Sequence, residues 1–245
     1  MKYYSNYSLK AHNTFGLDVR ARKFLEVSGE KAFREVLEDH SLPLFILGGG
    51  SNLLLTKDLE ALVVKNGIKG IEITEETDQD ALVAIGGGEN WHDCVTWSIS
   101  KELGGLENLS LIPGTAGAAP IQNIGAYGVE LEQVFQHFEN IDQKKKKKEV
   151  FHHKDCQFAY RNSVFKHKYK GQFFISRIYL RLSKFPQLNL SYGAVKATLQ
   201  AKGIQHPTLA DVCQAVIDIR RSKLPDPEQL GNSGSFFKNP EIEQE

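Results

Sequence analysis

The chain has little cysteine and no excess charge of either sign. Its three cysteines, Cys94, Cys156 and Cys213, form no CxxC pair, so a disulfide framework or a zinc site is not expected. Cys94 and Cys213 fall on apolar helical stripes and are expected in the core. The 30 basic residues balance 30 acidic ones, whereas a domain that binds duplex nucleic acid is usually basic overall. Nucleic acid is therefore not the expected partner.

Long apolar runs are also lacking. None reaches the roughly 18 residues that a membrane-spanning helix needs, and the polar segment 1–10 has no apolar core like that of a signal peptide. These absences predict a cytoplasmic protein without membrane insertion. The composition, 41% hydrophobic and 24% charged over 245 residues, is that of a globular protein with one large domain or two to three small ones.

Apolar periodicity predicts a mixture of helices and strands. Helices are expected over 29–40, from Trp91 to Leu103, over 191–199 and over 208–221, and strands over 44–47, 61–64, 71–74, 81–85, 129–141 and 173–182. Phe33, Val36, Leu37 and His40 share one face of the first helix. Thr208 is a candidate N-cap of the last helix.

Two of the expected strands run into three consecutive glycines. The first loop is Gly48–Asn52 and the second is Gly86–Gly88. Glycine lets backbone N–H groups approach an anion closely. Neither loop fits the dinucleotide fingerprint, because Leu53 and Trp91 stand where its last glycine belongs, and no P-loop is present. Two interpretations stay open: a phosphate cradle of another class, or tight turns between packed elements.

A long, nearly uncharged loop is expected over Pro113–Gly128. Loops of this length are usually functional or disordered, and the apolar residues within it argue against disorder. Its small residues let the backbone approach a large flat ligand, and Gln122 and Asn123 can donate and accept hydrogen bonds. The loop is therefore a candidate ligand-binding segment.

Arg161 and Ser235 are the candidate catalytic side chains. The Arg161 guanidinium suits a carboxylate or a phosphate, although a lone arginine more often forms a surface ion pair. Ser235 lies between Gly234 and two phenylalanines, and the chain has no Gly-x-Ser-x-Gly nucleophile motif. Proton transfer is therefore more plausible for Ser235 than covalent catalysis, and a turn serine is the alternative.

Two polar clusters have simpler interpretations. Lys144–Lys148 is a run of five lysines, which indicates a solvated hairpin tip or, alternatively, a phosphate- or nucleic-acid-binding patch. His152 and His153 lie beside Asp155 and Cys156 without a metal-ligand spacing, so no metal is expected.

Taken together, the motifs resemble the UDP-N-acetylenolpyruvoylglucosamine reductase family over nearly the whole chain. The matching segments, in the family's order, are Asn13–Gly16, Leu47–Asn52, Gly86–Trp91, Gly105–Asn108, Ile112–Gly128, Tyr160–Ser163, Lys223–Pro227 and Gly231–Pro240. The most specific are Pro-Ile-Gln-Asn-Ile-Gly-Ala-Tyr-Gly and Gly-Ser-Phe-Phe-Lys-Asn-Pro. Coincidence at all of them is not credible.

The resemblance implies an α+β fold that binds FAD between two subdomains, the type named after vanillyl-alcohol oxidase and p-cresol methylhydroxylase. This agrees with the missing dinucleotide fingerprint. We expect residues 1–66 to form FAD-binding subdomain 1, 67–218 to form FAD-binding subdomain 2, and 219–245 to begin a substrate-binding domain. The cofactor-binding residues implied are Leu47, Gly48, Gly49, Gly50, Ser51, Asn52, Pro113, Gly114, Thr115, Gly117, Ala118, Ala119, Gln122, Asn123, Gly125, Tyr127 and Gly128.

The resemblance also implies an activity. NADPH reduces FAD, and the reduced flavin passes hydride to the enolpyruvyl double bond of UDP-N-acetylenolpyruvoylglucosamine in peptidoglycan precursor synthesis. Arg161 resembles the active-site arginine and Ser235 the proton-donating serine. Substrate-binding residues of the family resemble Tyr160, Tyr192, Lys223 and Asn239. Tyr192 also suggests the subtype with a substrate-capping tyrosine loop.

Family members continue beyond Gly-Ser-Phe-Phe-Lys-Asn-Pro by about a small domain's worth of chain. That part completes the substrate domain and carries a catalytic glutamate. A chain of residues 1–245 alone is therefore expected to bind FAD weakly or not at all and to turn over poorly. The alternative to a reductase is a flavin-binding module or a remnant with impaired activity.

Overall fold

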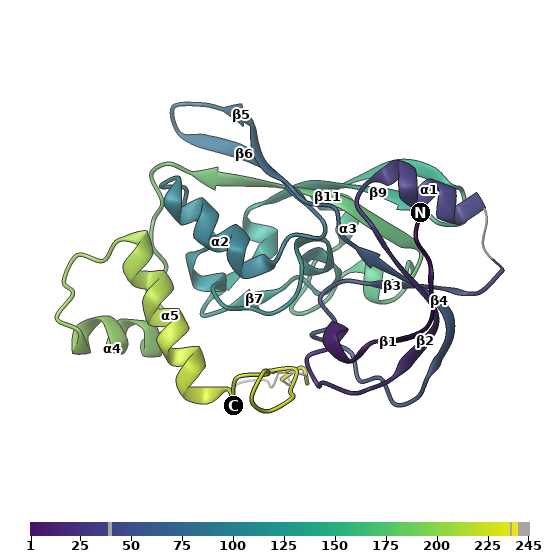
Figure 1. The fold of residues 1–245 in the computed structure, drawn as a ribbon. Coiled ribbons are helices and arrows are strands. Elements are labelled where there is room, and N and C mark those ends of the chain that lie inside the picture. The colour runs from purple at the N-terminus through teal and green to yellow at the C-terminus, as the bar shows by residue number, and fades with distance from the viewer. Residues whose placement is uncertain (39–40, 236, 240–245) are drawn as a thin grey trace, which may run out of the picture.

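The computed structural model describes residues 1–38, 41–235 and 237–239 (Figure 1). A four-stranded sheet occupies the N-terminal part, in the order β1-β2-β4-β3. Its strands are β1 (Tyr4–Ser8), β2 (Arg20–Val27), β3 (Leu44–Leu47) and β4 (Leu59–Asn66). β2 and β3 both run parallel to β4, and β1 pairs antiparallel with β2. The parallel strands therefore end at a common edge, where Gly48 follows β3.

Helix α1 (Glu30–Glu38) connects β2 to β3 and covers one face of this sheet. It buries Phe33, Val36 and Leu37, as the periodicity predicts, while His40 lies outside the described residues. Phe33 stacks on Phe174 of the second sheet, with 4.0 Å between the ring centroids. The apolar stripe of α1 therefore joins the two sheets.

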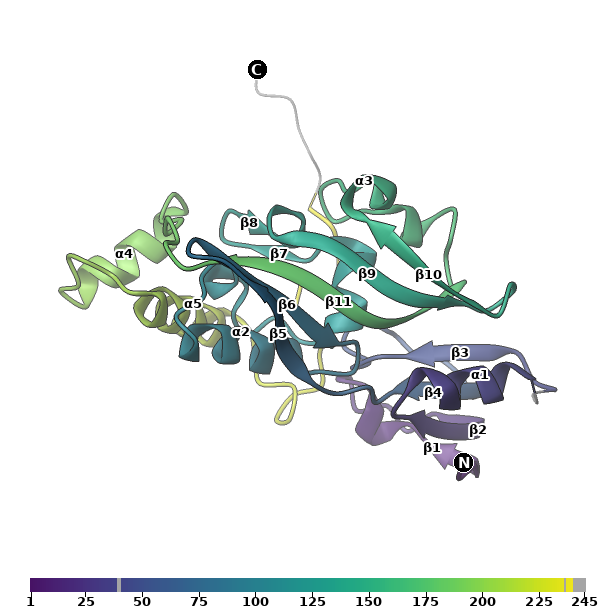
Figure 2. The same cartoon turned by 90° about the horizontal axis from the view of Figure 1, so that it is seen from above.

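The second sheet has five antiparallel strands in the order β10-β9-β11-β6-β5. Its strands are β5 (Ile71–Glu76), β6 (Asp80–Gly86), β9 (Phe135–Asp142), β10 (Lys147–His152) and β11 (Phe173–Ser183). Figure 2 shows this long twisted sheet beside the first sheet, with α4 and α5 at the end far from it. The large core cluster lies between the second sheet and the segments around α2.

The remaining helices are α2 (Trp91–Ser100), α3 (His153–Cys156), α4 (Gly193–Ala201) and α5 (Leu209–Lys223). Thr208 caps α5, where its hydroxyl accepts the Asp211 N–H, so the predicted N-cap is confirmed. α4 and α5 pack together through Val195, Leu199 and Val216. All three cysteines are buried, which confirms the core positions predicted for Cys94 and Cys213.

Short elements fill the long connections. They are the 3₁₀ turns η1 (Lys10–His12), η2 (Glu107–Leu109), η3 (Ala116–Gln122), η4 (Leu131–Gln133) and η5 (Val164–Lys166) and the two-residue strands β7 (Gly125–Ala126) and β8 (Val129–Glu130).

Two predicted elements were wrong in extent. The strand expected over 129–141 is β8, then η4, then β9, because the chain folds back on itself: Leu131 N donates to Ile124 O at 2.9 Å. Leu103 lies beyond the end of α2, which stops at Ser100, although its side chain is buried in the same cluster. The predicted strands near 44–47, 61–64, 71–74, 81–85 and 173–182 are confirmed.

In the described part of the chain, no helix is both long enough and apolar enough to cross a bilayer. The predicted boundaries after residues 66 and 218 stay predictions. The first sheet ends at Asn66 and the second begins at Ile71.

Candidate functional site

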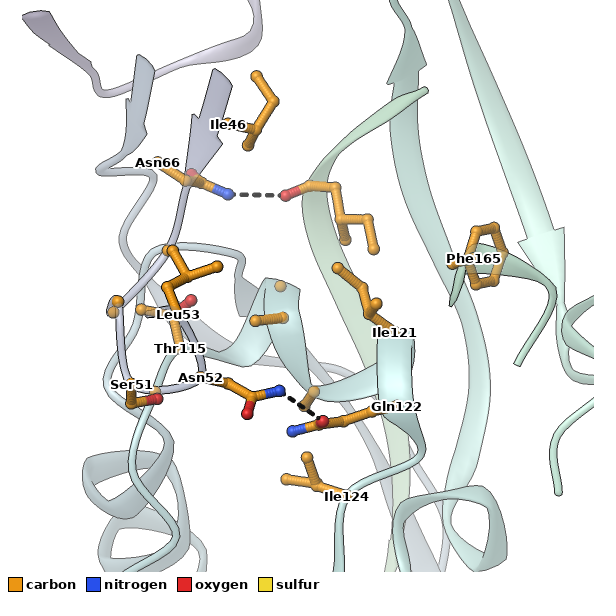
Figure 3. Close-up of a pocket in the computed structure, with 18 of the residues that line it drawn as sticks. Ile46, Ser51, Asn52, Leu53, Asn66, Thr115, Ile121, Gln122, Ile124 and Phe165 are labelled. Carbon is orange, nitrogen blue, oxygen red and sulfur yellow. Dashed lines mark hydrogen bonds between the residues drawn. The ribbon is translucent and has the colours of Figure 1, made fainter. Parts of the chain in front are cut away.

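A cavity of about 370 Å³ lies where the two sheets and the loop over 113–124 meet (Figure 3). The first sheet contributes β3 and the glycine loop that follows it. The second sheet contributes β11 and the segment around η5. The lining residues are Leu44, Phe45, Ile46, Gly48, Gly49, Gly50, Ser51, Asn52, Leu53, Asn66, Trp91, Pro113, Gly114, Thr115, Gly117, Ala118, Ala119, Ile121, Gln122, Ile124, Phe165, Lys166, Tyr169, Gly171, Phe173 and Ile175.

The loop Gly48–Asn52 requires its glycines. Gly50 has φ +64°, and a Cβ there would clash with the carbonyl oxygen of His12. A Cβ on Gly49 would lie 2.9 Å from Gly114 Cα, so the two glycine-containing segments touch backbone to backbone. No described group accepts a hydrogen bond from the backbone N–H of Gly49, Gly50, Ser51 or Asn52. A row of free N–H groups beside a cavity suits an anion such as a phosphate.

The second triple glycine, Gly86–Gly88, packs against other backbone instead. A Cβ on Gly86 would lie 2.5 Å from Ile68 O, and one on Gly88 would lie 2.6 Å from Asn66 O. The loop holds the ligand-facing segment in place, because Gly87 O accepts the Gly117 N–H at 2.9 Å. The structure thus favours a different interpretation for each loop: an anion cradle for the first and a tight, packed turn for the second.

Twelve of the residues expected to bind the cofactor line the cavity. They are Gly48, Gly49, Gly50, Ser51, Asn52, Pro113, Gly114, Thr115, Gly117, Ala118, Ala119 and Gln122. Asn52 Nδ2 donates to Gln122 Oε1 at 2.9 Å and links the two segments across the cavity (Figure 3). The cavity therefore brings together two stretches about sixty residues apart in the sequence.

Five further expected residues lie outside the lining. They are Leu47, Asn123, Gly125, Tyr127 and Gly128. Leu47 is buried in the core of the first sheet. Asn123 is also fully buried, in the left-handed conformation at φ 45°, and its Oδ1 accepts the Glu132 N–H at 3.0 Å. Its amide is thus used to shape the chain reversal before β8.

Arg161 lies beside this reversal. Its Nη1 is 2.9 Å from Glu130 Oε1, and its Nη2 donates to the Gly125 carbonyl. Burial raises the pKa of Glu130; the Arg161 charge opposes that rise and Glu132 adds to it. The guanidinium is therefore ion-paired, and partly exposed at 28% of its side-chain surface.

Tyr160 connects Arg161 to the C-terminal motif. The Arg161 guanidinium lies 4.9 Å from the Tyr160 ring centroid, and Lys238 Nζ lies 5.1 Å from the same centroid. Ser235 and Asn239 are exposed, and Phe236 and Pro240 lie outside the described residues. The fold thus brings Lys238 to the Arg161 turn.

Tyr192 and Lys223 belong to a second group at α4 and α5. Tyr192 precedes α4 and meets the Tyr127 ring edge to face, with centroids 5.2 Å apart. Burial raises the pKa of Tyr127, and a hydrogen bond with Arg220 opposes that rise. Lys223 is exposed at the last position of α5. Tyr192 is 47% exposed, so its ring is available to cover a bound molecule.

Asn66 and the aromatic side of the cavity were not predicted from the sequence. Asn66 Nδ2 donates to Ile175 O at 2.8 Å and its Oδ1 accepts the Ile68 N–H at 3.2 Å. A polar residue that ends an apolar strand was the available signal. The rings of Phe45, Phe165 and Tyr169 give no such signal, since apolar periodicity does not tell a cavity wall from a core.

The lysine run lies at the turn between β9 and β10. Lys145 pairs with Glu149, Lys146 with Glu38, and Lys148 with Glu30 and Glu139. These pairs favour the hairpin-tip interpretation over a nucleic-acid patch. Among the described residues, no group of three or more His, Cys, Asp or Glu side chains could hold a metal ion.

Comparisons with known proteins agree with this geometry. A family described as "FAD binding domain" matches residues 26–144. Proteins named UDP-N-acetylenolpyruvoylglucosamine reductase match nearly the whole chain. The one from Flavobacterium johnsoniae is 48% identical over 98% of this chain and 72% of its own length. The one from Pseudomonas aeruginosa is 48% identical over 96% of this chain and 70% of its own length.

Solved structures share the fold. The UDP-N-acetylenolpyruvylglucosamine reductase from Thermus caldophilus gives a TM-score of 0.58 at 18% identity, covering 91% of this chain and 95% of that chain. Cholesterol oxidase from B. sterolicum gives a TM-score of 0.52 at 13% identity, covering 74% of this chain and 37% of that chain. The predicted α+β FAD-binding fold is confirmed.

Proposed function

Because the chain belongs to the UDP-N-acetylenolpyruvoylglucosamine reductase family of FAD-dependent oxidoreductases, we propose that it takes part in the NADPH-dependent reduction of UDP-N-acetylenolpyruvoylglucosamine to UDP-N-acetylmuramate. This reaction belongs to peptidoglycan precursor synthesis. It consumes NADPH and one proton and forms NADP⁺ and the saturated sugar ether. The observation that carries the proposal is the row of N–H groups over Gly49–Asn52 at the cavity, which have no acceptor among the described residues.

The residues around the cavity fit FAD. A pyrophosphate accepts hydrogen bonds from N–H groups like those of Gly49–Asn52. The aromatic and aliphatic wall, which includes Phe45, Phe165 and Tyr169, suits a flat ring. FAD, when bound, supplies the hydride-transfer chemistry, and the protein supplies orientation and charge. We also propose the division at 1–66, 67–218 and 219–245, since it places the cavity between the two sheets.

The Arg161 turn is the proposed reaction centre. Hydride addition to the enolpyruvyl double bond places negative charge toward the substrate carboxylate, and a fixed guanidinium stabilises such charge. We assign this role to Arg161 and proton donation at the neighbouring carbon to Ser235. A neutral serine needs close positioning to act as an acid. The contact between Lys238 Nζ and the Tyr160 ring supports this arrangement, since it brings the segment that carries Ser235 to the Arg161 turn.

Tyr192, Lys223 and Asn239, together with Tyr160, are proposed to hold the UDP-sugar. Lys223 is an exposed cation suited to a diphosphate. The Tyr192 ring lies beside Tyr127 at the N-terminus of α4 and can cover a bound nucleotide-sugar. UDP-N-acetylenolpyruvoylglucosamine and NADPH are thus the proposed small-molecule partners.

Anaerobic visible spectroscopy of the 245-residue chain with added FAD tests the proposal. At a saturating concentration of FAD, because weak binding is expected, we expect a bound-flavin spectrum that bleaches with NADPH and recovers slowly when UDP-N-acetylenolpyruvoylglucosamine is added. Bleaching without recovery would leave a flavin-binding module and contradict the reductase assignment. The absence of a bound-flavin spectrum at saturating FAD would contradict the proposal that residues 1–245 hold the cofactor.

A further inference from the structure

Arg161 stands at the tip of a tight hairpin. Ala159 N donates to Asn162 O at 3.1 Å, and Asn162 N donates to Ala159 O at 2.9 Å, so Tyr160 and Arg161 are its two central residues. Arg161 adopts φ 52°, a left-handed conformation that costs a non-glycine residue about 1–3 kcal/mol and persists where the surroundings hold it in place. The contacts of its guanidinium therefore identify the groups that hold Arg161 in this conformation.

Two acceptors hold one side of this guanidinium. Glu130 Oε1 lies 2.9 Å from Nη1, and the Gly125 carbonyl accepts from Nη2. Gly125 must lack a side chain, because a Cβ there would lie 2.5 Å from Arg161 Nη1 and 2.9 Å from Glu130 Cγ. The small strand pair β7–β8, which pairs Gly125 with Glu130, is thus shaped around the arginine.

The carboxylate of Glu130 is itself fixed. Its Oε2 accepts a hydrogen bond of 2.8 Å from Asn123 Nδ2. Asn123 is fully buried, and it also donates to Ala159 O at 3.2 Å, the first residue of the Arg161 hairpin. One buried amide therefore connects the carboxylate to the hairpin that carries the guanidinium.

We propose that Glu130 is a positioning residue for Arg161. With the Gly125 carbonyl, it fixes the plane of the guanidinium and leaves the remaining N–H groups free for the carboxylate of the substrate. A guanidinium has five N–H donors in a rigid fork, so its orientation decides which of them reach a second anion. This inference rests on the proposed function, because it assigns to Glu130 a part in the reduction of the UDP-sugar.

A side chain that acts only through Arg161 should affect one half of the reaction. Reduction of the flavin by NADPH does not involve the substrate carboxylate, whereas reoxidation by the UDP-sugar does. Glu35 offers a matched control, since it is exposed on α1 and, among the described residues, takes no part in the contacts of Arg161, Glu130 or Asn123. Glu130→Asp keeps the charge and shortens the reach by one methylene.

Anaerobic stopped-flow absorption of the FAD-loaded chain measures both halves. We expect Glu130→Gln to slow reoxidation by UDP-N-acetylenolpyruvoylglucosamine by at least about tenfold, since a small misplacement of a positioned group has effects of this order or larger. Reduction by NADPH and the flavin content stay within about twofold of the parent, as do all measurements on Glu35→Gln. Glu130→Asp recovers part of the reoxidation rate. Adding Glu130→Gln to Arg161→Gln slows it no further, since both changes remove one function.

Two results would overturn the role of Glu130 while leaving the reductase assignment intact. One is reoxidation of Glu130→Gln at the parent rate. The other is an equal loss in both half-reactions or in flavin content, which would show a purely structural role. If the parent chain is reduced by NADPH but not reoxidised by the UDP-sugar, the proposed function itself fails, and the assignment of Glu130 fails with it.

Discussion

The two triple-glycine loops look alike in the sequence and differ in the structure. Gly48–Gly50 lines the cavity and leaves the N–H groups of Gly49 and Gly50 unbonded among the described residues, whereas Gly86–Gly88 is covered by the backbone of residues 66–69 and 175–176. In the first loop, Gly49 and Gly50 approach the backbone of Gly114 and His12, and Gly48 faces the side chains of Thr115 and Ala118, which line the cavity. In the second, glycine allows two strands and a turn to pack, and that packing positions the ligand-facing segment through the Gly117–Gly87 hydrogen bond.

Glycine therefore has two different structural roles in these loops, and the sequence motif does not distinguish them. A substitution at Gly87 in the second loop should damage the fold, whereas one at Gly48, whose nearest neighbours in the first loop are side chains, should damage ligand binding more than the fold. Three substitutions test this difference, in order of decreasing expected effect.

Gly87→Ala should have the largest effect. The added Cβ would clash with the carbonyl of Ile175 and would lie 2.7 Å from Asn66 Nδ2, and the backbone atoms there have no room to move. We expect a loss of about 3 kcal/mol in the free energy of unfolding, as for severe overpacking of a core. Denaturant unfolding followed by circular dichroism measures it. A loss below about 0.5 kcal/mol would show that the second loop is not tightly packed.

Asn66→Ala should have the next largest effect on stability. It removes the link from β4 to β11 and leaves Ile175 O without this donor. Loss of a buried hydrogen bond costs about 1–3 kcal/mol, measured by the same unfolding experiment. Asn52→Ala is the matched control: its bond to Gln122 is exposed, so the free energy of unfolding should change by less than about 0.5 kcal/mol. Equal losses in the free energy of unfolding would contradict the expectation that the buried bond of Asn66 stabilises the fold and that the exposed bond of Asn52 does not.

Gly48→Ala should affect binding more than folding. Its Cβ would lie 2.7 Å from Thr115 Oγ1, which can rotate, and 3.6 Å from Ala118 Cβ. Because these atoms line the cavity, the added methyl takes up ligand space. We expect the Kd for FAD to rise about tenfold, or about 1.4 kcal/mol, while unfolding changes by less than about 1 kcal/mol. Flavin fluorescence titration measures the first quantity. An unchanged Kd would place FAD elsewhere.

Much of the fold could be predicted from local pattern. The stripe Phe33, Val36 and Leu37 identified α1, and Thr208 marked the start of α5. The segment 129–141 could not be predicted in the same way. Its division into β8, η4 and β9 depends on Asn123 and on Ile124, which accepts from Leu131. These are tertiary contacts that override strand propensity.

The candidate site was predictable where glycine and small residues gather, as in Gly48–Asn52 and Pro113–Gln122. It was not predictable where the packing of the two sheets determines which residues line the cavity. Asn66 and Tyr169 line the cavity because two sheets meet there. No local sequence motif predicts that meeting. The pairing of Glu130 with Arg161 joins residues 31 positions apart. The guanidinium can occupy this place only because Gly125 has no side chain.

The most direct measurement of the central claim is an equilibrium titration of FAD into the parent chain and into Ala118→Trp. Ala118 lines the cavity and is partly exposed, so a tryptophan there fills the cavity without entering the core. A cofactor site in this cavity predicts that the parent binds FAD and quenches its fluorescence, while the folded variant, with an unchanged circular dichroism spectrum, binds at least about a hundredfold more weakly. Equal binding by both chains would contradict it.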